Sequence, residues 1–162
     1  MKTISEQGAI CFIHINKDKE WFLNGKRHRE DGPAIEDNVG TKHWYLNGLL
    51  HREDGPAIEY KDGSKEWWLN DNHHREDGPA IDYDDGHKEW WRNGLLHRID
   101  GPAIESSFGS KEWWLNGKRH REDGPAYEGL NSLYKEWYYH GQHIDCKNNQ
   151  EFLKIIKLIS FL

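Results

Sequence analysis

Polar and apolar residues alternate along this chain in short runs, and the pattern returns every 23 residues. Its clearest marker is the string His-Arg-x-Asp-Gly-Pro-Ala, which begins at His28, His51, His74, His97 and His120. An aromatic pair such as Trp67-Trp68 stands before each copy. A fixed period of this length is typical of one small supersecondary unit that stacks on copies of itself.

Each unit contains a turn that is predicted by the residues directly after the aromatic run. Asn-Gly is the strongest short signal for a two-residue β-hairpin, because both residues tolerate a positive φ. This signal stands at Asn24-Gly25, Asn47-Gly48, Asn93-Gly94 and Asn116-Gly117, with Asn70-Asp71 and His140-Gly141 as weaker forms. A second turn is predicted at Asp62-Gly63 and at Asp85-Gly86. The unit is therefore a set of short strands joined by tight turns.

A two-residue loop sets the register of the two strands that it joins. It places Trp21 opposite His28, and in the last hairpin it places Trp137 opposite Ile144. A position that accepts either His or Ile lies on an apolar face. We therefore expect the first aromatic residue and the His to point inward, beside Ile58 and its equivalents. The second aromatic residue of each pair then points to the other face.

The Asp-Gly-Pro-Ala segment is expected to form a corner after the hairpin. Proline restricts the preceding residue to extended backbone, and glycine at that place permits angles that other residues avoid. Asp can close the turn by accepting from a nearby N–H. The Asp recurs in every copy, whereas Ile99 replaces the preceding Glu in the fourth copy. We therefore expect the Asp to be the geometrically demanding residue.

The two ends of the chain depart from the repeat. Residues 1–19 are expected to form an N-terminal capping half-repeat before the array of residues 20–146. Residues 147–162 carry apolar residues at helical spacing, with Asn148 as N-cap and Glu151 three residues later. Exposed strand edges invite pairing with other chains, so this helix is expected to be a cap. Alternatives are a membrane-surface helix and a homodimer contact through the terminal caps.

The predicted fold is thus all-β, a β-solenoid of stacked hairpin repeats with a short C-terminal capping helix. The period, with Asn24-Gly25-Lys26-Arg27-His28 after Trp21, resembles the MORN repeat, which is a stacked β-hairpin. The longer string Trp-x-x-Asn-Gly-x-x-His-Arg-x-Asp-Gly-Pro-Ala resembles uncharacterised repeat proteins of tailed phages and giant viruses. The resemblance covers about residues 20–145. The chain lacks the Gly-x-Gly and the leading Tyr-Glu-Gly of MORN proteins.

The composition of the chain argues against some classes of function. Only 35% of the 162 residues are hydrophobic, but nine Trp, seven Tyr and five Phe offset this low content. The net charge of −6, with both signs mixed, argues against a binder of duplex nucleic acid. Cys11 and Cys146 lie in opposite terminal segments, which favours two reduced thiols and a cytoplasmic protein. The sequence shows neither a signal peptide nor a run that is apolar enough to span a membrane.

The recurrent His and Asp invite a catalytic or metal-binding interpretation. Catalysis normally uses one asymmetric constellation of perturbed groups, whereas five equivalent pairs fit a structural role. We expect each His to bond to its own turn, with Arg and Asp in a ladder between units. The isolated cysteines give no zinc pattern, and each Asp-Gly turn offers too few oxygens for calcium. The chain is therefore expected to be no enzyme and to hold no metal or cofactor.

The outward column of second aromatic residues is the strongest candidate for a binding surface, since aromatic residues are enriched in binding hot spots. Beside this column, Arg92 is the one charge at a position otherwise held by Leu or Tyr. The candidate residues are Tyr45, Trp68, Trp91, Arg92, Trp114 and Tyr138. The alternative is that this column packs against another layer of a two-sided coil.

The sequence therefore predicts a non-enzymatic binding protein with a protein partner. The resemblance to phage proteins implies that it binds and inhibits a host or defence protein in the host cell cytoplasm. One alternative is a binder that sequesters a nucleotide-like small molecule by stacking it between Trp columns. The other is a structural or virion-associated spacer.

Overall fold

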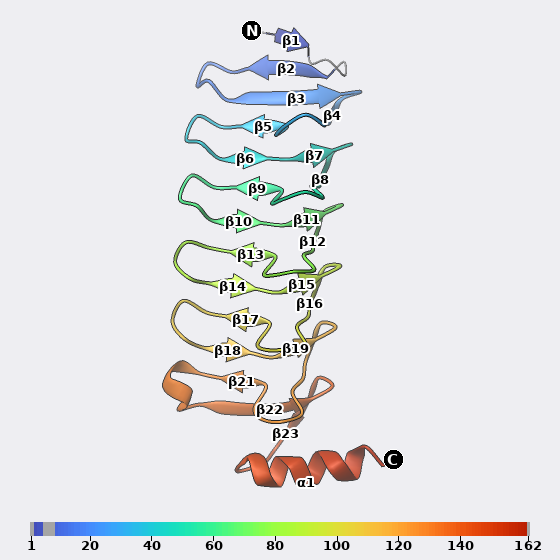
Figure 1. Cartoon of the computed structure of the whole chain (residues 1–162), viewed down its shortest axis with the longest axis vertical. Coiled ribbons are helices and arrows are strands. Elements are labelled where there is room, and N and C mark those ends of the chain that lie inside the picture. The colour runs from blue at the N-terminus through green and yellow to red at the C-terminus, as the bar shows by residue number, and fades with distance from the viewer. Residues whose placement is uncertain (1, 5–8, 162) are drawn as a thin grey trace. The chain divides into compact units, whose positions relative to one another are not determined.

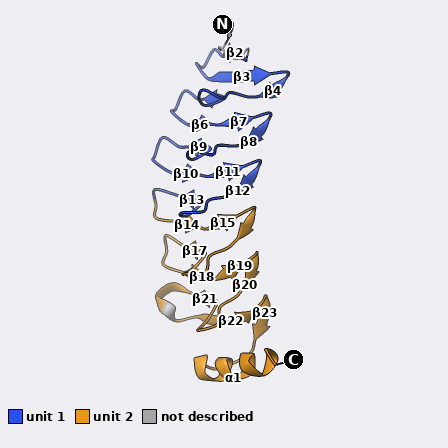
Figure 2. Ribbon diagram, turned by 45° about the vertical axis from the view of Figure 1, so that its right-hand side comes forward, with its two compact units in different colours: residues 1–84 blue, residues 85–162 orange. Residues whose placement is uncertain are grey.

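The structure, a computed structural model, describes residues 2–4 and 9–161. Parts of the expected caps, residues 1, 5–8 and 162, lie outside the described residues. The chain divides into two compact units, Met1–Asp84 and Asp85–Leu162, which Figure 2 colours separately. Both units consist mostly of short antiparallel β-hairpins, and an α-helix follows the last strand of the second unit (Figure 1). The predicted all-β fold with a C-terminal helix is confirmed at this level.

The first unit contains a main antiparallel sheet and separate hairpins beside it. The strands of the sheet follow the order β1 (Lys2–Ile4), β2 (Ile10–Ile13), β3 (Lys19–Leu23), β5 (Ile35–Glu36), β6 (Lys42–His43), β9 (Ile58–Glu59), β10 (Lys65–Glu66) and β13 (Ile81–Asp82). The remaining strands are β4 (Lys26–Arg27), which pairs with β3, and the hairpins β7 (Tyr45–Leu46) with β8 (Leu49–Leu50) and β11 (Trp68–Leu69) with β12 (Asn72–His73). Each full repeat thus contributes two strands to the sheet and one hairpin to its side.

The second unit repeats this plan and ends in the helix. The strands of its sheet are β14 (Lys88–Glu89), β17 (Ile104–Glu105), β18 (Lys111–Glu112), β21 (Tyr127–Glu128), β22 (Lys135–Tyr139) and β23 (Gln142–Ile144). Its side hairpins are β15 (Trp91–Arg92) with β16 (Leu95–Leu96) and β19 (Trp114–Leu115) with β20 (Lys118–Arg119). A 3₁₀ turn, η1 (Leu130–Ser132), precedes β22, and the helix α1 spans Asn149–Ile159.

The predicted hairpin turns and their register are confirmed. Asn47 and Gly48 have φ values of 54° and 89°, as a two-residue turn of this type requires. In the last hairpin Trp137 lies opposite Ile144. Because the side-chain period of a strand is two, this register also settles which side chains share a face.

One part of the predicted face assignment is wrong. Ile58 is paired with His43 and Glu66, and cross-strand partners share a face. The N–H of Trp44 instead donates to the carbonyl of Ala57 at 2.8 Å. Successive strand residues point to opposite faces, so Trp44 lies on the face of Ala57 and away from Ile58. The alanines at this position are 0% exposed, namely Ala34, Ala57, Ala80, Ala103 and Ala126.

The corner is organised by its arginine. The guanidinium carbon of Arg52 lies 4.1 Å from the centroid of the Trp44 ring. Its Nε donates to Asp54 at 2.8 Å, and its Nη1 donates to the carbonyl of Pro56 at 3.2 Å and to Glu59 at 3.0 Å. The same stacking and the same donation to Asp and to the Pro carbonyl recur at Arg29, Arg75, Arg98 and Arg121. The arginine therefore joins the indole, the corner and the following strand.

The corner glycine has a different role from the expected one. None of these glycines has a positive φ, so unusual backbone angles do not explain them. A Cβ at Gly55 would lie 3.0 Å from the guanidinium carbon of Arg52, and the equivalent distance at Gly78 is 2.9 Å. The arginine side chain fills the space in which a Cβ would lie, so any other residue at this position would force the stacked guanidinium to shift.

The C-terminal helix begins as predicted. Asn148 accepts from the N–H of Glu151 at 3.0 Å, and the Glu151 carboxylate accepts from the N–H of Lys147 at 3.0 Å. The ring of Phe152 is 0% exposed. The side chain of Asn149 donates to the carbonyl of Asp123 at 2.9 Å. The first turn of the helix is thus attached to the last corner of the second unit (Figure 1).

We expect Gly55→Ala to destabilise the protein by about 1–3 kcal/mol, because the new methyl group collides with the Arg52 side chain. In an Arg52→Ala background the same change should cost less, since the colliding group is gone. Denaturant unfolding of both single variants and of the double variant gives the coupling energy between the two positions. Additive effects would contradict this role of the glycine.

We expect Phe152→Ala to lower the free energy of unfolding by about 3–5 kcal/mol, as is usual for a fully buried ring. The matched control is Leu158→Ala on the same helix. Leu158 is 71% exposed, and its truncation should change stability by no more than about 0.5 kcal/mol. Equal losses in denaturant unfolding would show that the helix is not held through Phe152.

Candidate functional site

Grooves open between the corners of successive repeats. In the first unit one groove of about 670 Å³ lies between the corners that begin at Arg29 and Arg52. The next groove, of about 530 Å³, lies between the corners at Arg52 and Arg75. In the second unit a groove of about 680 Å³ lies between the corners at Arg98 and Arg121. Equivalent residues line each of them, so the groove is a property of the repeat.

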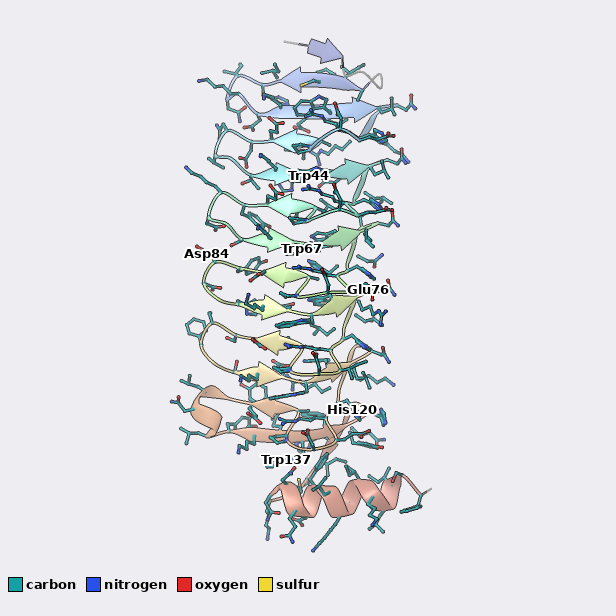
Figure 3. The ribbon with its side chains drawn as sticks, in the orientation of Figure 1. Trp44, Trp67, Glu76, Asp84, His120 and Trp137 are labelled. Atoms are coloured by element: carbon teal, nitrogen blue, oxygen red, sulfur yellow. The ribbon has the colours of Figure 1, made fainter. Side chains whose placement is uncertain are left out.

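Each groove combines an apolar lining with acidic rims. Trp44, Leu46 and His51 line the first groove, and Trp44 and Trp67 mark successive grooves in Figure 3. The corners on either side carry exposed carboxylates. The side chain of Glu53 is 85% exposed and that of Asp54 is 84% exposed. The hydrogen bond from Arg52 lowers the pKa of Asp54, so this carboxylate keeps its charge into acidic pH, paired with that arginine at 2.8 Å.

The groove of the second unit differs at one rim position. Ile99 stands where the other corners have Glu, and it is 83% exposed. The Nε2 atom of His97 has no hydrogen-bond partner among the described residues. The equivalent atom of His51 lies 3.6 Å from the carboxylate of Glu53. Ile99 therefore removes a rim charge and the carboxylate that lies near the histidine in the other corners.

Within each unit, the histidine of the motif connects one repeat to the following repeat. The Nδ1 atom of His28 accepts from the N–H of Asn47 at 3.0 Å, and that of His120 accepts from the N–H of His140 at 3.0 Å. An imidazole that accepts at Nδ1 is neutral and carries its proton on Nε2. Burial lowers the pKa of His120, which favours this neutral form.

This arrangement reverses the expected roles of His and Arg. The expectation placed the His bond within its own turn and the Arg–Asp pair between units. In the structure the His of one repeat bonds to the turn of the following repeat, and the Arg–Asp pair closes a single corner. The physical reason is reach, because Asp lies two residues from the Arg and the Arg side chain folds back over its own corner.

On the opposite face, the second aromatic residues donate to a row of carboxylates. Glu66 is 6% exposed and accepts from Trp68 at 3.0 Å, from Tyr60 and Tyr83 at 2.9 Å, and from His73 at 3.3 Å. Burial alone would raise the pKa of Glu66, but these four donors bring it down to about 2. The carboxylate is therefore charged and fully engaged within the fold.

In the second unit this face has the same construction. Trp91, Trp114 and Tyr138 donate to Glu89, Glu112 and Glu136 at 2.6, 3.0 and 3.2 Å. The guanidinium of Arg119 lies 5.3 Å from the ring centroids of both Trp114 and Tyr138. In the first unit Arg27 lies 5.6 Å from the ring of Tyr45. Protein side chains thus occupy space beside these rings that a stacked ligand would need.

Five of the six predicted site residues lie on the face that carries the row of carboxylates. Tyr45 and Trp68 lie on the carboxylate face of the first unit, and Trp91, Trp114 and Tyr138 lie on that face of the second. Arg92 is exposed and pairs with Leu95, as predicted. By repeat position Arg92 is equivalent to the groove residues Leu46, Leu69 and Leu115.

The grooves themselves were not among the sequence predictions. The available signal was the recurrence of acidic residues inside the His-Arg-x-Asp-Gly-Pro-Ala string, together with a Leu two residues after the first Trp. These residues are separated along the chain and meet only when two corners lie side by side.

No known family model matches this chain, and no curated protein matches it significantly in sequence. Among the described residues, no group of three His, Cys, Asp or Glu side chains is placed to hold a metal ion. None of the helices in the described part of the chain is long and apolar enough to cross a membrane. Both cysteines are free thiols.

We expect Glu66→Gln to flatten the acid unfolding profile. The pKa of Glu66 is depressed in the folded state, so its charge contributes stability above its ordinary pKa of 4.5, and this contribution is lost as the pH falls toward about 2. The free energy of unfolding should therefore fall more steeply with acid in the wild type than in the variant. Trp68→Phe removes one donor and should give an intermediate slope. Superimposable pH profiles would contradict this assignment.

Proposed function

We propose that this chain is a non-enzymatic binding protein whose grooves between successive corners receive side chains of a partner protein. The recurrence of one groove with one kind of lining carries this proposal. A linear array of equivalent sites suits a long partner that touches several repeats at once, because repeat proteins use extended surfaces for binding. The partner gains affinity from each groove that it occupies.

A binding role fits the polar groups of the site better than catalysis does. In the groove, the Nδ1 atom of His51 lies 3.0 Å from the side-chain oxygen of Asn70 in the next repeat, and its Nε2 atom lies 3.6 Å from the carboxylate of Glu53. The Asp of the same corner is bonded to the Arg rather than to the His. No nucleophile lies between an acid and a base in this arrangement, and the same contacts recur in other repeats.

The nature of the partner follows from the resemblance. Similarity of the motif to repeat proteins of tailed phages and giant viruses favours a viral protein that binds and inhibits a host or defence protein in the cytoplasm. We also interpret the array as a MORN-like β-solenoid of residues 20–146 between a half-repeat cap and a helical cap. The described contacts of Phe152 and Asn149 support the helical cap.

The proposal is tested with two leucine-to-arginine variants on opposite faces. Leu69→Arg fills a groove, and the repeat tolerates it because Arg92 occupies the equivalent position. The matched control, Leu50→Arg, lies opposite Tyr45 on the other face, where Arg27 and Arg119 stand at the equivalent position. Partners captured from host lysate are identified, purified and titrated against each variant.

We expect Leu69→Arg to weaken partner binding by about tenfold or more, or about 1.4 kcal/mol, and Leu50→Arg to leave it unchanged. The opposite result would move the binding site to the aromatic face. A bound ligand that absorbs near 260 nm in the purified protein, without a protein partner, would favour nucleotide sequestration. A chain that captures neither would be a spacer.

A further inference from the structure

We propose that the occupant of the grooves is an extended, positively charged peptide segment with Lys or Arg at every third residue. This inference rests on the proposed function and specifies the chemistry of the partner. It follows from three features of the grooves in the first unit, which are their exposed charge, their lining and their spacing.

The exposed charge of the rims is negative. The corner arginines face inward, since the guanidinium of Arg75 lies 3.9 Å from the centroid of the Trp67 ring and its Nη1 donates to the carbonyl of Pro79 at 3.2 Å. The carboxylates face outward, and the side chains of Glu53 and Asp77 are among those most exposed around this groove. A partner that enters the groove therefore meets carboxylates first, and a cationic side chain is complementary to them.

The lining suits the rest of such a side chain. Trp67 and Leu69 line the groove below the rims. Lys and Arg carry an apolar stem of three or four methylene groups, which packs on apolar surface while the charged head stays at the polar rim. Asp77 is already paired with Arg75 at 2.9 Å, so Glu53 is the rim carboxylate that lacks a cationic partner among the described residues. An acidic partner would be repelled by the rims, and a wholly apolar partner would leave Glu53 without a counter-charge. The groove thus selects a long cationic side chain over both.

The spacing of the grooves sets the spacing of the cations. Each repeat adds two strands to the sheet, such as β6 and β9 before β10. At about 4.8 Å per strand, neighbouring grooves are roughly 9.6 Å apart. A polyproline II helix rises about 9.3 Å in its turn of three residues and presents every third side chain on one side. A β-strand has a side-chain period of two, so its third residue would point away from the array.

Labelled peptides of equal composition test the inference. One peptide carries Arg at every third position in a proline-rich backbone, and the other carries the same residues with the arginines adjacent. Fluorescence polarisation at physiological salt measures binding of each peptide to the full chain. We expect the regularly spaced peptide to bind about tenfold more tightly, and we expect raised salt to weaken its binding.

Protein variants locate the binding in the grooves. Glu53→Gln should weaken binding about threefold or more by removing a rim charge, whereas Asp145→Asn, which removes an exposed charge that lines none of these grooves, should leave it unchanged. Ile99→Glu restores the missing rim carboxylate of the second unit and should strengthen binding. Position 99 is exposed, so this gain should not depend on a change in folding.

Each contrary outcome has a distinct meaning. Equal affinity for the two peptides, or binding that is insensitive to Glu53→Gln and to Ile99→Glu, would overturn this inference. If neither peptide binds while a purified partner still binds in a manner sensitive to Leu69→Arg, the inference fails and the proposed function stands. If partner binding is also insensitive to Leu69→Arg, the proposed function fails as well.

Discussion

The rest of the structure depends on the stacking of one guanidinium on one indole in each repeat. Arg52 contacts the Trp44 ring on one side and occupies the space beside Gly55 on the other, while its nitrogens donate to Asp54 and to the next strand. Arginine alone combines a planar cation that stacks on an aromatic ring with several donors in fixed directions. A short repeat with few aliphatic residues can therefore form a defined corner without a large apolar core.

The surface chemistry follows from that interaction. Because the arginine of each corner is turned inward, the acidic residues of the same string remain on the outside and form the rims of the grooves. The histidine meanwhile bonds through Nδ1 to the turn of the following repeat in the same unit, as His28 does to the N–H of Asn47, and this bond ties the two repeats together. The groove is thus a consequence of how the repeat is held together. The residues that form the corner also form the groove, so the groove recurs wherever two corners lie side by side.

The two faces of the repeat use aromatic residues in different ways. On the groove face an indole supports a cation of the protein itself, and its neighbour is a fully buried alanine. On the other face, indole and phenol groups donate to carboxylates such as Glu66, whose remaining acceptor capacity is taken by neighbouring side chains. The side chains of that face form an internal hydrogen-bond network. The carboxylates at the corners accept fewer hydrogen bonds within the fold. This difference directs the search for a partner toward the grooves.

The sequence by itself determined the Asn-Gly turns, the pairing of Trp137 with Ile144 and the start of the helix at Asn148. These features depend on backbone angles and on residues close together in the chain, which local patterns report directly. Only the tertiary structure decided that Ala57 rather than Ile58 accompanies Trp44, that the His reaches the next repeat, and that two corners enclose a groove. Those outcomes depend on how far side chains extend across a neighbouring repeat. Because the pattern is the same in every repeat, the sequence does not show which side chains of one repeat contact the next repeat.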